Sequence, residues 1–150
     1  TAQLLCTAYR HLWLAADQPP HEILYKETHK NHPCAVWARK SSHNYRWLVD
    51  YFKALHDEWL YRGHSAHASY TKLFDTLSAP AYAVAFHSID LVTFDFDCSN
   101  VDEPGSLASR YQQCLFQKWF LDTRKPTWEN RGKPEWLTQF QLDCIEGNAK

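Results

Sequence analysis

The sequence predicts a mainly α-helical protein, in the form of a compact single-domain helical bundle with one long central helix and little or no strand. A chain of 150 residues suits one ordinary domain. Apolar residues recur at spacings of three or four in several segments, and Ser, Pro and Gly stand at the ends of those segments. Strict alternation of apolar and polar residues occurs only at Val92, Phe94 and Phe96.

The longest helix is expected within residues 41–62. Its first residues, Ser41 and Ser42, suit an N-cap, and Gly63 suits a C-terminal stop. The residues expected to share its core-facing side are Tyr45, Leu48, Phe52, Leu55 and Trp59. This spacing predicts that all five are buried, and that truncation of Leu55 to alanine leaves a costly cavity.

Shorter helices are expected before and after it. They cover residues 4–12, 33–39, 65–77, 106–121 and 134–144. Ser65 and Ser106 are expected as N-caps, whereas Pro33 and Pro134 are expected to open helices, since the N–H that proline lacks has no partner in a first turn. Residues 81–97 suit either a strand or an irregular buried segment.

Charge is nearly balanced overall, with 16 Lys and Arg against 17 Asp and Glu, but it is unevenly distributed. Residues 26–46 contain five basic residues and one acidic residue, and residues 110–133 contain six basic and two acidic residues. An acidic segment, residues 90–103, separates them. Aromatic residues lie among the basic ones, a pattern typical of surfaces that follow phosphates and stack bases; helix faces over core aromatics explain it equally well.

Several function classes are excluded or disfavoured. No apolar run is long enough for a membrane span, and no signal peptide is recognisable. The four Gly residues stand apart, which excludes a phosphate-binding loop. The five Cys form no CxxC pair and read as small buried hydrophobes, and the nine His lack metal-site spacing, so neither a metal nor a cofactor is predicted.

A polar cluster is the candidate site. On a helix Glu58 and Arg62 lie four residues apart and can pair, and Gly63 lets the chain turn so that His64 returns over the same face. His32 and Asn44 would border this cleft if either the His32-Pro33 segment or the C-terminal basic stretch folds across the helix. Otherwise there are two separate patches, with Asn44 capping a neighbouring element. The polar cluster itself is explained equally well as an ordinary exposed ion pair above an aromatic core.

The chain resembles a family of small proteins of phages and large DNA viruses. The resemblance rests on Ala-Gln-Leu-Leu-Cys-Thr-Ala at residues 2–8, on His-Pro, Asn-Tyr and Trp-Leu within residues 32–48, on Glu58, Tyr61, Arg62 and His64, and on Lys-Pro-Glu-Trp at residues 133–136. More remotely, the His-Pro pair, the long helix and Glu followed by Arg-Gly resemble the small helical pyrimidine-dimer DNA glycosylases.

The glycosylase resemblance implies a helical DNA-repair fold in which an N-terminal amine attacks the sugar C1′ and a helix-borne Glu assists. Thr1 would supply the amine if the protein starts there. Relatives carry a further segment before the block at residues 2–8, so Thr1 is either the true start or an internal position of a longer protein, in which case this nucleophile is lost.

The leading hypothesis is therefore a DNA-acting protein, a glycosylase/lyase-like enzyme or a descendant that retains binding. Glu58, His64 and Thr1 are the catalytic candidates. The nucleic-acid-binding candidates are His32, Arg39, Asn44, Arg46, Arg62, Arg110 and Lys118. The alternative is a non-enzymatic viral accessory protein that docks a partner through the Trp-rich residues 128–136. Either protein is expected in the cytoplasm, that of the host cell if it is viral; the sequence indicates no oligomeric state.

Overall fold

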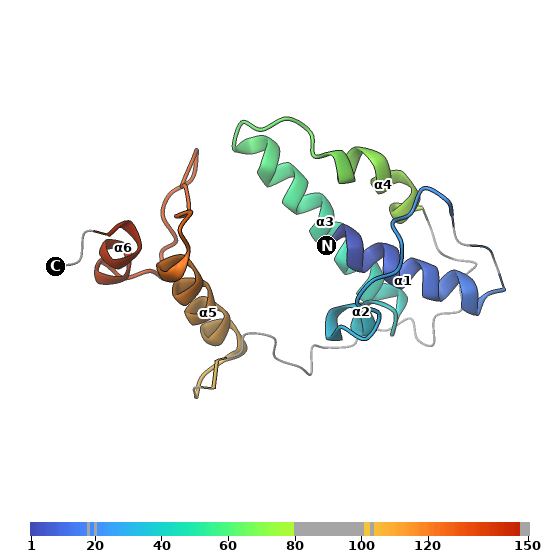
Figure 1. Cartoon of the computed structure of the whole chain (residues 1–150), viewed down its shortest axis with the longest axis horizontal. Helices are drawn as coiled ribbons and strands as arrows, with labels where there is room; N and C mark the ends of the chain where they lie inside the picture. The colour runs from blue at the N-terminus through green and yellow to red at the C-terminus, as the bar shows by residue number, and fades with distance from the viewer. Residues whose placement is uncertain (18, 20, 80–100, 103, 148–150) are drawn as a thin grey trace. The chain divides into compact units, whose positions relative to one another are not determined.

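The computed structural model describes residues 1–17, 19, 21–79, 101–102 and 104–147. Within them the chain forms six helices and no strand (Figure 1). They are α1 (Ala2–Ala15), α2 (Pro33–Ala38), α3 (Ser42–Tyr61), α4 (Ala68–Ser78), α5 (Leu107–Leu121) and α6 (Gln139–Glu146). The mainly helical class is thus confirmed. The expectations for residues 81–97, a strand at Val92–Phe96 included, lie outside the described residues.

Contacts divide the chain into two compact units, Thr1–Phe94 and Asp95–Lys150, and each is described by itself. We call them the N-terminal and C-terminal units. The single domain, the bundle arrangement and the central position of the long helix stay predictions.

In the N-terminal unit, α1 packs against α2, α3 and α4, and α3 also packs against α2 and α4. The centre of this core is apolar and closed: Leu5, Ala35, Trp37 and Leu73 are almost completely buried. The loop after α1 is tied back to it, since the Arg10 guanidinium donates to the carbonyls of Leu24 and Tyr25 at 2.8 and 2.7 Å.

The long helix α3 begins and ends as its sequence predicts, and it is the longest helix of the described part of the chain. The Ser41 hydroxyl accepts a hydrogen bond from the Asn44 N–H at 3.1 Å, which satisfies a first-turn donor. After α3, Gly63 adopts a φ of 83°, a left-handed conformation that glycine reaches without a steric penalty.

Burial along α3 corrects the predicted core. Tyr45, Leu48 and Phe52 are buried, whereas Leu55 and Trp59 are 44% and 40% exposed. Leu55 lies about 60° around the helix from Phe52, away from the centre of the packed face. Trp59 lies close to that face in angle but two turns further along, where it lines an open pocket instead of the core.

Two helix starts also differ from prediction. His67, not Ser65, caps α4, because the His67 Nδ1 accepts from the Ser69 N–H at 3.2 Å. The last helix starts at Gln139 rather than Pro134, since residues from Pro134 to Leu137 form a turn closed by a 3.0 Å bond. There Thr138 and Gln141 satisfy one another's backbone N–H groups in a capping box.

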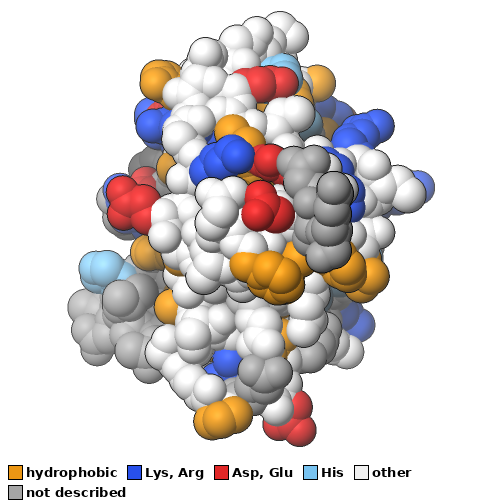
Figure 2. Space-filling view, turned by 90° about the vertical axis from the view of Figure 1, so that its left-hand side faces the viewer, with side chains coloured by type: hydrophobic (Ala, Val, Ile, Leu, Met, Phe, Trp, Pro, Cys, Tyr) orange, Lys and Arg blue, Asp and Glu red, His pale blue; other side chains and the backbone are white. Residues whose placement is uncertain are grey.

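The C-terminal unit has a small core of its own. Leu137, Leu142 and Ile145 are buried, and the partly buried side chains packed against them are Phe116, Trp119, Trp128 and Trp136. No residue of α5 is fully buried, so its expected apolar face is only partly covered. Figure 2, which looks onto the left-hand side of Figure 1, shows hydrophobic side chains at the surface among charged ones.

The prediction that the cysteines are small buried hydrophobic residues is confirmed only for some of them. Cys6 is buried, and burial raises the pKa of its thiol. Cys34, Cys114 and Cys144 are half-buried, and Cys98 lies outside the described residues. The described cysteines form no disulfide.

Candidate functional site

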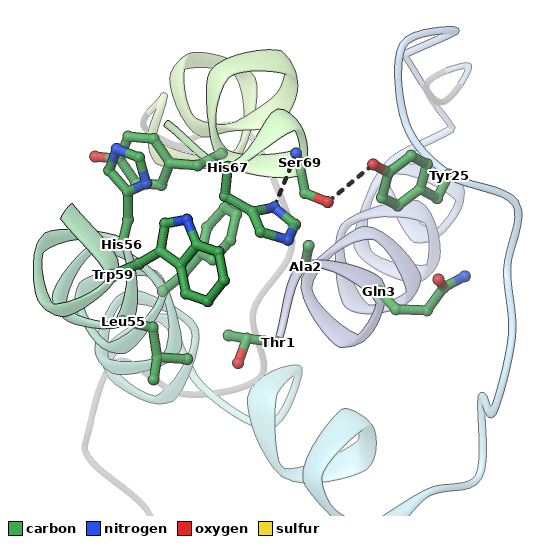
Figure 3. Close-up of a pocket in the computed structure, with 11 residues that line it drawn as sticks. Thr1, Ala2, Gln3, Tyr25, Leu55, His56, Trp59, His67 and Ser69 are labelled. Atoms are coloured by element: carbon green, nitrogen blue, oxygen red, sulfur yellow. Dashed lines mark hydrogen bonds between the residues drawn. The ribbon is translucent and has the colours of Figure 1, made fainter. Parts of the chain in front are cut away.

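An open pocket of about 550 Å³ lies in the N-terminal unit (Figure 3). It is bordered by the start of α1, the second half of α3, the start of α4 and the loop that carries Tyr25. Its lining residues are Thr1, Ala2, Gln3, Tyr25, Phe52, Leu55, His56, Trp59, His67, Ser69 and Tyr70. The walls are mainly apolar and aromatic with a few polar groups, which is the usual make-up of a ligand pocket.

In the pocket wall, Trp59 is fixed by one hydrogen bond and two ring contacts. Its indole N–H donates to the Ser65 carbonyl at 2.9 Å, and the His64 ring stacks on it with centroids 3.8 Å apart. His67 approaches the indole edge-on at 6.1 Å. The indole therefore fixes the loop between α3 and α4 while 40% of its surface stays open.

A chain of polar contacts fixes the opposite side. The Tyr25 hydroxyl donates to the Ser69 Oγ at 3.1 Å, and the Ser69 N–H donates to the His67 Nδ1 (Figure 3). Because Nδ1 accepts, a neutral His67 carries its proton on Nε2. His67 is thus an N-cap whose second nitrogen is free to donate.

His56 presents the site's unsatisfied atom. Its ring stacks on Tyr70 with centroids 3.7 Å apart and nearly parallel. Its Nδ1 is buried and, with Thr28 Oγ1, is one of two buried side-chain polar atoms of the described residues that have no hydrogen-bond partner. Unsatisfied buried polar atoms are uncommon in structures and call for a role.

Thr1 caps α1 without a side-chain bond, and its carbonyl accepts from the Leu5 N–H at 3.0 Å. It lines the pocket together with Leu55 and Trp59. In a chain that starts at this residue, burial lowers the pKa of the α-amine below its ordinary value of 8.0, and the nearby Cys34 opposes this shift. Such an amine is more readily neutral, and hence nucleophilic, at neutral pH.

Glu58 and Arg62 form the ion pair that their spacing predicts, with 2.9 Å between the Glu58 Oε1 and the Arg62 Nε. Both side chains are about one-third exposed. None of the three candidates Glu58, Arg62 and His64 lines the pocket. His64 stacks on the indole of Trp59, which does line it. Glu58 precedes Trp59 on α3, and Arg62 caps the C-terminus of that helix.

His32 and Asn44 do not join them. Asn44 lies 14 residues before Glu58, about 20 Å along the helix. It is completely buried, and its Nδ2 donates to the Trp37 carbonyl at 2.9 Å. This structural contact between α2 and α3 replaces the predicted place at the cleft and leaves the side chain no open surface for nucleic acid.

The remaining basic candidates of the N-terminal unit lie around the α2–α3 corner. His32 caps α2 by accepting from the Cys34 N–H, Arg39 donates to the Lys30 carbonyl at 2.7 Å, and Arg46 is exposed on α3. In the C-terminal unit, Arg110 donates to the Gly105 carbonyl at 3.0 Å, and Lys118 is exposed in the last turn of α5.

The described residues contain no group of three or more His, Cys, Asp or Glu side chains that could hold a metal ion. None of their helices is both long and apolar enough to cross a membrane.

Residues 5–72 match the family described as pyrimidine dimer DNA glycosylase. The matched part of the chain is thus similar to that family, and it contains all the pocket-lining residues except Thr1, Ala2 and Gln3. No curated protein and no solved structure matches the chain.

Sequence reasoning missed Leu55, His56, Trp59 and His67 as site residues. Two of them were assigned to the core because they continue an apolar pattern, and a pattern cannot show where the packed partner ends. The His64–His67 pair was visible in the sequence, but only the fold shows that both rings meet Trp59.

Proposed function

We propose that this protein acts on DNA as a glycosylase/lyase-like repair or modification enzyme. One observation carries the proposal: the segment that matches the pyrimidine dimer DNA glycosylase family, residues 5–72, is the segment that builds most of the pocket. The pocket's aromatic walls suit a planar base, and the basic residues 26–46 of the same unit suit phosphates.

The proposed reaction assigns the attack to the α-amine of Thr1 in a chain that begins there. The amine lone pair forms a bond to the sugar C1′, the bond from C1′ to the base breaks, and the base leaves with that electron pair. The attacking nitrogen loses one proton, which is transferred to the leaving base. The nitrogen lone pair then forms the C1′=N bond while the C1′–O4′ bond breaks, and O4′ takes the second nitrogen proton, so that the ring-opened sugar is held as an imine. Burial around Thr1 supports this role because it lowers the pKa of the amine.

Glu58 and His64 are proposed to assist the reaction. The Glu58 carboxylate, held by Arg62, would stabilise positive charge that develops on the sugar. His64, which stacks on Trp59, would carry the proton from the attacking nitrogen to the leaving base. DNA contacts are assigned to His32, Arg39, Arg46, Arg62, Arg110 and Lys118. A viral origin, and with it action in the host cytoplasm, stays a prediction.

The test is trapping of the imine. The chain beginning at Thr1 is incubated with radiolabelled undamaged, abasic and dimer-containing duplexes in the presence of borohydride, which reduces the imine to a stable amine. We expect a covalent protein–DNA adduct with abasic or dimer-containing DNA and none with undamaged DNA.

Thr1 has a matched pair of controls. The variant Thr1→Ser keeps the amine and should still be trapped, whereas the chain with an acetylated α-amine should not. Equal trapping of the acetylated chain refutes the role of Thr1. Absence of any adduct, together with unchanged DNA, refutes the enzyme and leaves at most a binding protein.

A further inference from the structure

Trp47 and Tyr51 form an exposed aromatic pair on α3. In the sequence they precede the residues of α3 that line the pocket. They lie four residues apart, their rings stack with centroids 5.5 Å apart and 15° between the planes, and each residue is 44% exposed. An exposed stacked pair of this kind presents apolar ring surface to the solvent.

A buried residue of α2, Trp37, supports the ring of Trp47. Trp37 of α2 is 2% exposed and meets the Trp47 ring edge-on, at 5.6 Å and 88°. The Trp37 backbone is itself fixed, because its carbonyl accepts from the buried Asn44 amide. Because the rings of this pair are already ordered, they lose less conformational entropy when a ligand stacks on them.

The charges around the Trp47–Tyr51 pair indicate which kind of ligand it can bind. Arg46 precedes Trp47, and Arg39 and Lys40 lie at the corner where α2 meets α3. Residues 26–46 contain only one acidic residue, Glu27, and its carboxylate lies 3.2 Å from His11. Asp50, one turn after Arg46, is the nearest acidic residue along α3. A polyanion with planar apolar groups complements this surface better than a neutral apolar partner does.

We propose that Trp47 and Tyr51 stack an unpaired base of the DNA, with Arg46 and the α2–α3 corner beside the phosphates. Leu55 and Trp59 continue the same ridge of every fourth residue, which rises about 6 Å and turns about 40° around the helix at each step. Both line the pocket. The ridge therefore runs from the exposed pair toward the pocket. This inference rests on the proposed function only in taking DNA as the partner.

The experiment measures fluorescence anisotropy of labelled, undamaged oligonucleotides: a short single strand of thymines and a fully paired duplex of equal length. Base stacking on one aromatic residue predicts that Trp47→Ala weakens single-strand binding by roughly 5- to 150-fold. Binding to the paired duplex should change much less, since its bases are not open to stacking. Trp47→Phe should retain most of the single-strand affinity.

Two further variants keep the result independent of folding. Tyr51→Ala removes the outer ring without touching Trp37, and should also weaken single-strand binding. Leu60→Ala removes an exposed apolar residue of the same helix and should not. Each variant's helical circular dichroism must match the parent's.

The inference is overturned if the parent does not bind the single strand, if Trp47→Ala binds it unchanged, or if Leu60→Ala weakens it equally. A pair that instead mediates self-association, seen as a Trp47-dependent dimer in sedimentation, also overturns it. Because the oligonucleotides carry no lesion, a failure of the glycosylase proposal in the trapping test leaves this result readable.

Discussion

Asn44 shows how one residue's burial decides its role. Its side-chain amide closes the junction of α2 and α3 from inside the core, 20 Å from the end of α3 that carries Glu58. In the sequence it is one polar residue among many near a helix start, and no local pattern distinguishes an inward from an outward amide. Its position on the helix was predictable, and its hydrogen-bond partner was not.

We expect Asn44→Ala to lower the free energy of unfolding by about 1–3 kcal/mol, because it leaves the buried Trp37 carbonyl without this donor. Urea denaturation measures it. Asn31→Ala, the same change at an exposed asparagine, should stay within about 0.5 kcal/mol of the parent. Equal effects of the two variants contradict the structural role.

Glu58 and its neighbour Asp57 provide a matched test of catalysis. Each forms an i,i+4 ion pair along α3 and its C-cap, Glu58 with Arg62 and Asp57 with Lys53, and solvent-exposed pairs of this kind contribute little to stability. We expect Glu58→Gln and Asp57→Asn to change stability little, but only Glu58→Gln to reduce borohydride trapping. Stability loss with full activity in Glu58→Gln would make Glu58 a structural partner of Arg62 alone.

The Thr1 amine predicts a pH dependence. Burial lowers its pKa, so in a chain that starts at Thr1 the neutral, reactive form persists to lower pH than in an unburied amine of pKa 8.0. We expect the trapping rate to rise with pH and to reach half its plateau below pH 8.0, after correction for DNA binding. A midpoint at or above 8.0 would show that the pocket does not desolvate this amine.

At the scale of elements, α3 shows both the strength and the limit of pattern reasoning. Its start and end were predictable, because the cap at Ser41 and the glycine at 63 are local signals. The buried side was predictable only as far as Phe52. Beyond it, burial depends on which elements lie opposite, and this is a tertiary property.

Two leucines on this helix test that correction. Leu48→Ala removes a buried side chain and should cost about 2–5 kcal/mol, whereas Leu55→Ala, at 44% exposure, should cost less than about 1 kcal/mol. Chemical denaturation of both variants gives the comparison. Similar losses would place Leu55 back in the core.

The N-terminal starts of α4 and α6 show why some helix boundaries were not predicted correctly. Ser65 and Pro134 are ordinary start signals, but histidine can also cap through its ring nitrogen, and Thr138 with Gln141 forms a complete capping box. Where two cap candidates compete within a few residues, hydrogen-bond geometry decides, and residue type alone does not.

For the whole molecule, near-neutral net charge restricts how DNA can be bound. Attraction must come from local patches, chiefly residues 26–46 and 110–133, through release of counterions. The composition of these patches was predictable from the sequence. The contacts of individual side chains within the fold, such as the hydrogen bond from Arg39 to the Lys30 carbonyl, were not.

Charge reversal tests the first patch. We expect Arg39→Glu with Arg46→Glu to reduce the steepness of the salt dependence of DNA binding by about two phosphate contacts. Lys53→Glu, an exposed lysine paired with Asp57 on α3, should leave that slope unchanged. Titrations at several salt concentrations give the slopes; identical slopes would exclude the 26–46 patch.

The tryptophan cluster of the C-terminal unit has an optical consequence. Trp119 lies parallel to Trp136 with centroids 5.7 Å apart and edge-on to Trp128 at 5.6 Å. Indoles this close couple their electronic transitions and give an exciton signal in circular dichroism. Trp37 and Trp47 of the N-terminal unit are equally close, so the signal of the C-terminal unit is the part that Trp136→Phe removes. That signal reports the packing around Leu137, Leu142 and Ile145 without any attached label, and it makes the C-terminal unit visible in the intact chain.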